Sequence, residues 1–593
     1  MVPTGDHAAD THSTEKAHVD AGNSNPQVQL GNTRLMPTDR GDTRSASQGR
    51  LEDIEQLGRR LQRAVGLDDA HSSPLLSLPD ELIVKIIRRV RESNVIIERS
   101  TQSRLSRPVP WNVTVTVCRR LRQIVAGSPS LHTHLSNVLH STYYLDLSIV
   151  RSDPLPLNLY ISEPSQYGMD EMRQWTNGVL KVHGHRIESI TFQTSRSNLS
   201  GVPDWLNHTP CLRSLSLHYD VDHNSSGTIN ATAESILSAI FAALTTSTKP
   251  KVEHVASLCI NGPLPPYGVS AGVVYHNLTD LSLRNVIFSF ISDPGLSIIL
   301  SLTTRLERLT LHNVCPVDIS MNPSFMLVSP HPPLALPSTL RVLDYSGSKH
   351  PEFVLLEAFI PNTSTRLIIT CTDEMRRSVV RIRRVLELWM GPGRLTKAAT
   401  LHITNNGVNN HVSYAQVKLS LWSACDEDMT CPPDIEYNFD RMEIGGNSLM
   451  FLPDMMNGPS YEGLQRLHAK VDDTTYSLLQ SWRVGHHLQT PHLRDLSLLP
   501  NLASEPHFSL DVWFFRRWLH SRYATGNLLH TLTISSEMAD ALDGLGESRP
   551  QPSCSAPVIM RREDFDEPPP ETLGESPSWR DTVSEVVVVN LGP

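Results

Sequence analysis

The stretch LERLTLHN, residues 306–313, contains the pattern that decides the fold: apolar residues at Leu306, Leu309 and Leu311 with polar residues around them. The last two apolar positions are two residues apart, which is the spacing of side chains on one face of a β-strand. The first position lies three residues earlier and is expected to anchor the approach to that strand. Each copy of the pattern therefore predicts a short strand with one apolar face.

The same apolar-x-x-apolar-x-apolar pattern occurs ten times between residues 187 and 534. Stretches such as CLRSLSLH (211–218) and LRDLSLLP (493–500) can be laid over one another directly. Gaps between neighbouring copies include 23, 25, 28 and 29 residues, and gaps of 58 and 66 residues are each close to two units. A single unit cannot bury its own apolar face, so the units must stack on one another.

Amphipathic segments lie between the copies, for example AESILSAIFAALTTS (233–247) and SVVRIRRVLELWMG (378–391). Each is expected to form a helix that covers one side of the strands. The sequence therefore predicts an α/β solenoid with an irregular repeat array over residues 180–540.

A different pattern precedes the repeats. In PLLSLPDELIVKIIRRV (74–90), Ser77 and Asp80 have the spacing of a helix capping box, and Pro79 fits a first helical turn. Apolar residues then recur at intervals of three and four, which predicts one broad apolar helix face. These residues are Leu78, Leu82, Ile83, Ile86, Ile87 and Val90.

A second apolar stripe follows in PWNVTVTVCRRLRQIVAGSPSLHTHL (110–135), at Val117, Leu121, Ile124 and Val125. Pro110 can open a helix, but the valines of NVTVTV alternate with polar residues as in a strand. Periodicity leaves both interpretations open for that segment.

The ends of the chain carry weaker signals. Residues 1–48 are polar and without periodicity, which is typical of a disordered tail, and residues 49–66 predict a short amphipathic helix. Residues 545–582 are expected to be a disordered linker. The β-branched run in 583–593 predicts a terminal strand, which would promote aggregation if it were exposed.

Composition limits the classes of partner. The formal net charge of −10 does not fit the basic surface of a nucleic-acid-binding protein, and no apolar run reaches the roughly 18 residues of a membrane span. The eight cysteines are scattered without a C-x-x-C pair, and the N-terminus lacks a secretory signal. We therefore expect reduced thiols, a cytoplasmic or nuclear location, and no nucleic-acid or membrane partner.

No catalytic signature emerges from the sequence. A P-loop, a G-x-S-x-G elbow, an H-E-x-x-H pair and a Rossmann fingerprint are all absent. Cys425 and Cys431 lack the second pair that a zinc site needs, and the H-x-H pairs at 132–134 and 183–185 are more typical of surface histidines. We expect no catalytic residues, no metal and no cofactor.

The segment 74–135 resembles an F-box, in particular the version common in large fungal families of F-box-like proteins. The resemblance rests on LSLPDELIVKII and on PW…VCRRLRQIVAGSPSLHTHL. His132 stands where the family commonly has Trp, and the insert before Pro110 is longer than in a minimal F-box. The resemblance implies that residues 110–126 are helical and that the downstream array consists of leucine-rich repeats. The Asn that closes many such repeats is mostly absent, and Asn501 is its clearest match.

The resemblance implies a function without chemistry in this chain. An F-box docks on a Skp-type adaptor, which joins it to a cullin that carries the ubiquitin-transferring subunits, and the repeats hold a protein substrate whose identity the sequence does not give. The residues implied to contact the adaptor are Leu78, Pro79, Leu82, Ile83, Ile86, Trp111, Val117, Cys118, Leu121 and Ile124. Each of them could instead pack within the F-box itself.

Two other functions remain open. The chain could be a non-catalytic binding scaffold in which a degenerate F-box only caps the repeat array. It could also be an enzyme whose motifs are not recognised, in which case a deep pocket with titratable side chains would be expected.

Overall fold

A computed structural model describes the following residues of the chain: 77–89, 118–136, 142–162, 169–194, 205–219, 235, 237–244, 255–262, 264, 272–288, 295–316, 334–347, 353–362, 364–371, 379–390, 396–409, 412–423, 431–444, 463–471, 492–500, 509–544 and 578–589. The chain divides into two compact units, Met1–Leu78 and Pro79–Pro593. Only residues 77 and 78 of the first unit are described. The expected tail (1–48) and helix (49–66) lie outside the described residues.

Helical elements alternate with strands through most of the second unit. An unlabelled helix spans residues 80–89 and another includes residues 237–244. The labelled helical elements are α4 (Arg119–Gly127), η1 (Pro129–Leu131), α5 (Thr142–Arg151), α6 (Met169–His183), η2 (Gly184–Arg186), α9 (Gly272–His276), α10 (Gly295–Leu302), α12 (Phe353–Ala358), α13 (Val379–Met390), α16 (Ser509–Ala524), α17 (Ser536–Gly544) and η11 (Trp579–Thr582).

Sixteen strands form one large sheet. In sheet order they are β1 (His134–Ser136), β2 (Leu157–Ser162), β3 (Ile187–Thr194), β4 (Ser214–Tyr219), β5 (Ser257–Asn261), β6 (Asp280–Arg284), β8 (Arg308–His312), β11 (Val342–Gly347), β13 (Arg366–Cys371), β16 (Ile435–Ile444), β15 (Val412–Trp422), β14 (Ala398–Asn409), β17 (Arg466–Val471), β18 (Asp495–Pro500), β19 (Leu529–Ser535) and β20 (Val583–Val589). Two small parallel pairs, β7 (Ile287–Phe288) with β9 (Cys315–Pro316) and β10 (Leu334–Ala335) with β12 (Phe359–Ile360), lie outside it.

Each of the ten sequence copies leads into a strand of this sheet, so the predicted strands are confirmed. From β1 to β13 every pairing in the large sheet is parallel and follows chain order, and β17 to β20 pair in the same way. Corresponding residues of the copies stand opposite one another, as Leu281 does to Leu309 and Leu309 to Leu343. The architecture is therefore α/β with a mostly parallel sheet.

The 58-residue gap between copies contains one extra parallel strand, β13. The 66-residue gap, also close to two units in length, does not contain one further parallel repeat strand. It contains β15, which pairs antiparallel with β14 and with β16, and β16, which also pairs parallel with β13. After β13 the chain therefore enters the sheet at β14, and β15 and β16 then occupy the two positions between β14 and β13 in reverse order. β17 pairs with the other edge of β14.

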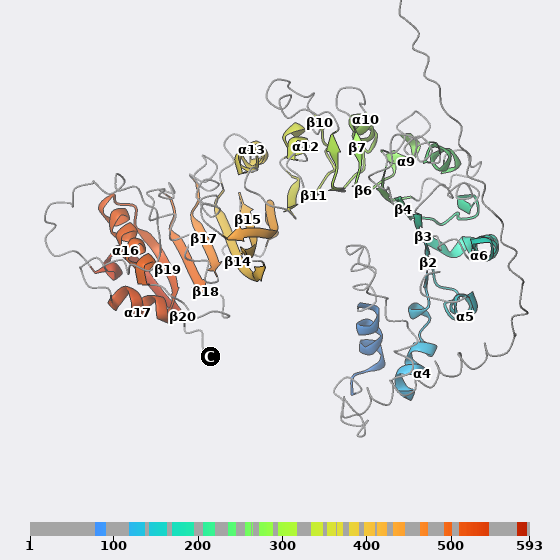
Figure 1. The fold of residues 1–593 in the computed structure, drawn as a ribbon, viewed down its shortest axis with the longest axis horizontal. Helices are drawn as coiled ribbons and strands as arrows, with labels where there is room; N and C mark the ends of the chain where they lie inside the picture. The colour runs from blue at the N-terminus through green and yellow to red at the C-terminus, as the bar shows by residue number, and fades with distance from the viewer. Residues whose placement is uncertain are drawn as a thin grey trace, which may run out of the picture. The chain divides into compact units, whose positions relative to one another are not determined.

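One face of the sheet is packed under helices and holds a continuous apolar core (Figure 1). The alternating strand residues enter this core, as Leu281 and Leu283 do in β6. The described parts of the two amphipathic segments include residues 237–244 and 379–390, which are helical, as expected, and contribute apolar side chains such as Ile240 and Val385. Each helix covers only one side of the strands, so the opposite side keeps polar residues.

The sheet extends beyond the predicted limits of 180 and 540. It begins at β1, inside the segment that resembles an F-box, and ends at β20. Residues 578–582, expected to belong to a disordered linker, instead include the turn η11. Trp579 is buried there, and Ser578 and Asp581 form a reciprocal capping box. The burial of one large aromatic side chain explains why this short polar segment is ordered.

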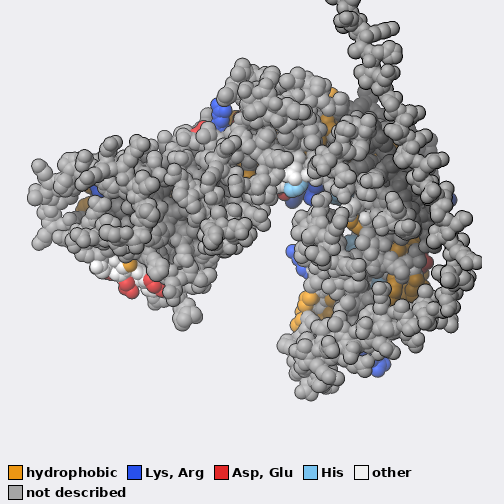
Figure 2. Space-filling model, viewed as in Figure 1, with side chains coloured by type: hydrophobic (Ala, Val, Ile, Leu, Met, Phe, Trp, Pro, Cys, Tyr) orange, Lys and Arg blue, Asp and Glu red, His pale blue; other side chains and the backbone are white. Residues whose placement is uncertain are grey.

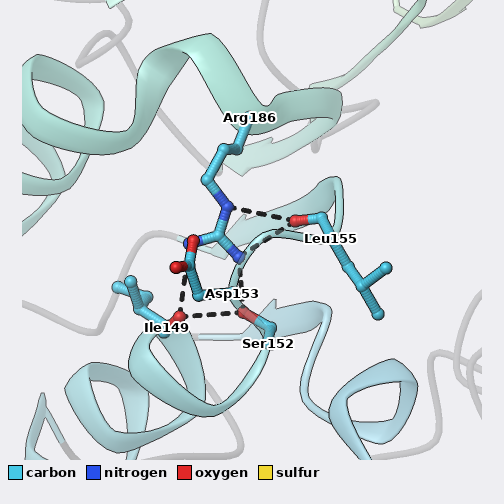
Figure 3. Close-up of polar contacts among 5 residues, drawn as sticks. All are labelled: Ile149, Ser152, Asp153, Leu155 and Arg186. Atoms are coloured by element: carbon cyan, nitrogen blue, oxygen red, sulfur yellow. Dashed lines mark hydrogen bonds and ion pairs between the residues drawn. The ribbon is translucent and has the colours of Figure 1, made fainter.

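The buried side chain of Arg186, which directly precedes β3, is hydrogen-bonded to the end of α5 and the loop after it (Figure 3). The guanidinium of Arg186 donates to the carbonyl of Leu155 at 2.9 and 3.1 Å, to that of Ile149 at 3.3 Å and to the hydroxyl of Ser152 at 2.9 Å. Asp153 lies 3.2 Å from it, mostly exposed. Arg186 thus donates to a carbonyl in the last turn of α5, where no helical partner is available, and to the carbonyl of Leu155 beyond the helix end.

Asparagines form a ladder where three neighbouring strands end. The side chain of Asn285 donates to Asn261 at 2.7 Å, and that of Asn313 donates to Asn285 at 3.0 Å. Asn285 and Asn313 have φ angles of 50° and 51°, a left-handed conformation that asparagine tolerates better than most residues. Asn285 and Asn313 each lie one position before the place where the closing Asn of a leucine-rich repeat is expected. Those places are occupied by the buried Val286 and Val314. Asn501 lies outside the described residues.

Candidate functional site

The helix of residues 80–89 begins after Pro79, whose carbonyl accepts from the backbone N–H groups of Leu82 and Ile83 at 3.0 and 3.2 Å. Its predicted apolar face is divided. Ile83 is 1% exposed, whereas Leu82 and Ile86 are 42% and 40% exposed. Pro79 is also exposed and Leu78 is half-buried. Figure 2 shows hydrophobic side chains at the surface over this helix. Pro79, Leu82 and Ile86 are named here the docking face.

Helix α4 begins at Arg119, later than the resemblance implies. Cys118 is extended, with φ −153° and ψ 164°, and its Sγ accepts from the N–H of Leu121 at 3.4 Å. The expectation that Cys118 is helical is therefore wrong, because its side chain caps the helix instead. Leu121 and Ile124 are buried. Residues 110–117, including Trp111 and Val117, lie outside the described residues.

An ion pair joins the two helices, and each helix contributes buried apolar side chains. Five buried apolar residues before β1 are not members of the continuous core: Ile83, Leu121, Ile124, Val125 and Leu131. Nη2 of Arg120 donates to Oδ1 of Asp80 at 2.6 Å. His132, where the F-box family commonly has Trp, is half-buried, and its Nε2 lies 2.8 Å from the carbonyl oxygen of Val125. Among the described residues implied to bind an adaptor, three are buried (Ile83, Leu121 and Ile124), three are exposed (Pro79, Leu82 and Ile86) and two are half-buried (Leu78 and Cys118).

A second surface lies on the polar face of the sheet. Strand registers align the side chains of this face in rows that cross the strands. One row contains Ser216, Cys259, Ser282, Thr310 and Asp344. Most of these side chains are half-buried, because neighbouring strands crowd them on both sides. Figure 2 shows basic, acidic and histidine side chains over the strands near β6 and β11.

Glu436 on β16 organises one group of charges on this face. Its carboxylate accepts from Arg366 at 2.7 Å, from Lys418 at 2.8 Å and from Asn438 at 3.2 Å. Burial would raise the pKa of Glu436, but the three hydrogen bonds and the charge of Lys418 together hold it below its ordinary value. Glu436 therefore remains ionised at neutral pH and pairs with two cations.

Asp344 on β11 has a different environment. Burial raises the pKa of its carboxyl group above the ordinary value, and the charges of Arg308, Arg284 and Arg366 oppose that shift while Glu436 adds to it. The neighbouring His312 contacts Ser346, and burial together with the charge of Arg284 lowers the pKa of its imidazole. His312 is therefore neutral at pH 7. The central part of the polar face thus carries both signs of fixed charge.

Sequence reasoning did not identify this group of charges. The spacing of the apolar residues indicates which side chains leave the core, but only the strand registers bring Arg284, Arg308 and Asp344 together. The sequence signal for this group is the set of polar residues between the leucines. These residues line up across the sheet only when the order of the strands is known.

Two further observations concern only the described part of the chain. No group of three or more His, Cys, Asp or Glu side chains there is placed to hold a metal ion. Among the described helices, none combines the length and the apolar composition needed to cross a bilayer.

Comparison of the sequence with protein-family models and with curated proteins finds no match.

Proposed function

We propose that the chain is the substrate-recognition subunit of an SCF-type (Skp–cullin–F-box) ubiquitin ligase. In this role the helix of residues 80–89 and α4 form an F-box that docks on a Skp-type adaptor. A leucine-rich-repeat solenoid holds the protein substrate. The chain itself performs no chemistry: it raises the effective concentration of substrate lysines near the ubiquitin-carrying subunit of the assembly.

The observation that carries the proposal is the exposure of Leu82 and Ile86, one turn apart on a short helix. A docking helix must also be held in place by buried side chains. Ile83, Leu121 and Ile124 are buried and meet this requirement. An apolar face kept out of its own core is typical of a surface that binds another protein.

The repeat half is supported by the sheet. Eight strands from β1 to β11 follow one another in chain order with parallel pairing, and corresponding leucines stand side by side. A stack of units that each bury a face against the next is the arrangement of a repeat protein. Its polar face would offer a long binding surface for an extended substrate.

The test is a pull-down of the purified full-length chain with a purified Skp-type adaptor. We expect the double variant Leu82→Asp/Ile86→Asp to lose binding at least tenfold, because two carboxylates would be desolvated at the interface. The matched control is Val150→Asp/Val182→Asp, which adds the same charges at residues 72% and 64% exposed on α5 and α6. Circular dichroism should show that both variants keep the helix content of the wild type.

The outcomes separate the proposal from its alternative, a binding scaffold in which the helical segment caps the repeats. That alternative is favoured by the position of α4 and η1, which directly precede β1, the first strand of the sheet. Loss of binding in the docking-face variant alone supports the receptor function. No binding by the wild type supports the scaffold, and equal loss in the control variant excludes the docking face as the adaptor site.

A further inference from the structure

Two opposite charges on the polar face make no ion pair within the described part of the chain: the carboxylate of Asp344 and the guanidinium of Arg284. Among the described residues, the guanidinium of Arg284 donates only to the hydroxyl of Ser282, through Nε at 3.3 Å. Asp344 accepts no hydrogen bond from a described residue, although it is half-buried between its neighbours on β8 and β13. The carboxylate of Asp344 is therefore available to a donor from a bound partner.

Unlike Asp344 and Arg284, the other charged side chains nearby form ion pairs with one another. Arg308 lies 3.8 Å from Asp280, on the side of β6. Arg366 and Lys418 both bind Glu436, on the side of β16. Arg308 and Asp280 neutralise each other, whereas Arg366 and Lys418 share the single carboxylate of Glu436 and leave one excess positive charge on the side of β16. Between these pairs, a ligand meets the negative charge of Asp344 and the positive charge of Arg284.

The strand registers fix the spacing of the two charges. Arg284 stands opposite His312, and His312 stands opposite Ser346, so Arg284 is level with the residue two positions beyond Asp344. Two strand spacings of about 4.8 Å and a step of about 6.6 Å along a strand give roughly 12 Å between the Cα atoms. In an extended segment, residues four apart share one face and lie about 13 Å from each other.

We propose that Asp344 and Arg284 select an extended protein segment that carries a Lys or Arg opposite Asp344 and, four residues away, an Asp or Glu opposite Arg284. The segment crosses β6, β8 and β11 on the polar face, and the charge complementarity defines its chemistry. The inference deepens the substrate-binding half of the proposed function and does not depend on adaptor docking.

The energetic reason lies in burial. The same desolvation that disfavours the charge on Asp344 strengthens its attraction to an incoming cation, because water screens the pair less. Thr310 and Ile368 flank Asp344 in the row and carry no charge. Arg308 and Arg366 also act on Asp344, but each is paired with another carboxylate, Asp280 and Glu436 respectively. The contact therefore contributes more to selectivity than an exposed surface pair would.

The test uses the full-length chain, without adaptor, on immobilised short peptide libraries with two fixed positions and random residues elsewhere. One library fixes opposite charges four residues apart, in both orders. The others fix two basic residues, two acidic residues, or opposite charges two residues apart. We expect the wild type to bind the first library about tenfold better than the others, which corresponds to one net ion pair of about 1.4 kcal/mol.

Charge reversal assigns each position. Asp344→Arg should shift the preference to two acidic residues, and Arg284→Glu should shift it to two basic residues. Glu585→Gln, an exposed carboxylate of β20 on the same sheet, is the control and should leave the preference unchanged. Equal binding of all libraries by the wild type, no binding of any library, or an unchanged preference in Asp344→Arg would overturn the inference. Because no adaptor is present, none of these results bears on the docking face.

Discussion

Asp80 and Arg120 form an ion pair of 2.6 Å that joins the helix of residues 80–89 to α4, and both side chains are largely exposed. An exposed pair contributes little to stability, because solvent screens it and both side chains lose freedom. We therefore expect the burial of Ile83, which is 1% exposed, to hold this helix in place more than the ion pair does.

The first prediction separates these contributions. Ile83→Ala should destabilise the two-helix segment by about 2–4 kcal/mol, because it removes a fully buried branched side chain. Leu82→Ala should cost less than about 1 kcal/mol, since that side chain is already exposed. Hydrogen exchange of α4, measured by mass spectrometry, reports the local opening of this segment. Equal loss of protection in both variants would contradict the assignment of Leu82 to the surface.

The second prediction concerns the buried guanidinium in Figure 3. Arg186→Met keeps much of the side-chain volume but removes every donor to Leu155, Ile149 and Ser152. We expect a loss of about 1–3 kcal/mol, because the partly buried carbonyl of Leu155 loses both of its side-chain donors, while that of Ile149 keeps the hydroxyl of Ser152. Arg151→Met, at an exposed position of α5, is the control and should change stability by less than about 0.5 kcal/mol. A shift of the thermal midpoint of similar size in both variants would argue against the network.

A pair of glycines gives the third prediction. A Cβ on Gly184 would lie 2.0 Å from the carbonyl oxygen of His208, so Gly184→Ala must displace backbone between η2 and the turn before β4. Gly178, inside α6, has nothing within 4 Å of the same position. Gly178→Ala should stabilise the chain by about 0.5–1 kcal/mol, because alanine favours helix. Thermal melting should therefore move in opposite directions for the two variants, and movement in the same direction would contradict the close approach at Gly184.

The fourth prediction follows from the lowered pKa of Glu436. A carboxyl group whose folded pKa lies below its unfolded value of 4.5 stabilises the fold above that pH, and this contribution is lost as the pH falls through the folded pKa. Glu436→Gln should be less stable than the wild type by about 1–3 kcal/mol at pH 7, because charged hydrogen bonds are lost. The difference should shrink below pH 4.5.

Urea denaturation at a series of pH values, followed by tryptophan fluorescence, measures this effect. Glu585→Gln serves as the exposed control, and its denaturation midpoints should match those of the wild type. A difference between Glu436→Gln and the wild type that stays constant down to pH 3 would show that the carboxylate charge is not the cause.

Sequence reasoning found the strands that begin with an apolar anchor and, from its β-branched run, β20, but it overlooked other strands without an anchor. In β13, Leu367 and Ile369 are buried like any other copy, but the anchor position three residues before Leu367 is the exposed Ser364. Thr365 is buried there, and its hydroxyl donates to the carbonyl of Leu340 at 2.8 Å. The only sequence signal for this strand is the alternation of three apolar residues, and that pattern is too common in proteins to predict a strand by itself.

Long-range features were beyond the reach of local patterns. The placement of β15 and β16 between β13 and β14 depends on pairing across many residues, for which spacing gives no information. Helical periodicity likewise predicted one broad apolar face at residues 80–89. It could not separate Ile83 from Leu82 and Ile86, because only the packing of α4 decides which side of that face is covered.

The last prediction concerns β20, which pairs with β19 from Leu529 to Ser535 and covers that edge of the sheet. The strand is held by Trp579, which is buried and donates from Nε1 to Oδ1 of Asp543 at 2.7 Å. Trp579→Ala should cost about 3–5 kcal/mol locally. We expect β20 to detach, because terminal segments open at a free energy below that of the core.

Detachment would expose the edge of β19 and the valine run of β20, both of which can pair with other chains. Limited proteolysis should therefore cut Trp579→Ala near residue 578 much faster than the wild type, and light scattering should show aggregation at concentrations where the wild type stays clear. Val588→Thr is the control: Val588 is 42% exposed on β20, and threonine keeps the β-branched shape. Wild-type resistance to proteolysis in Trp579→Ala would mean that the backbone pairing with β19 holds β20 without the tryptophan.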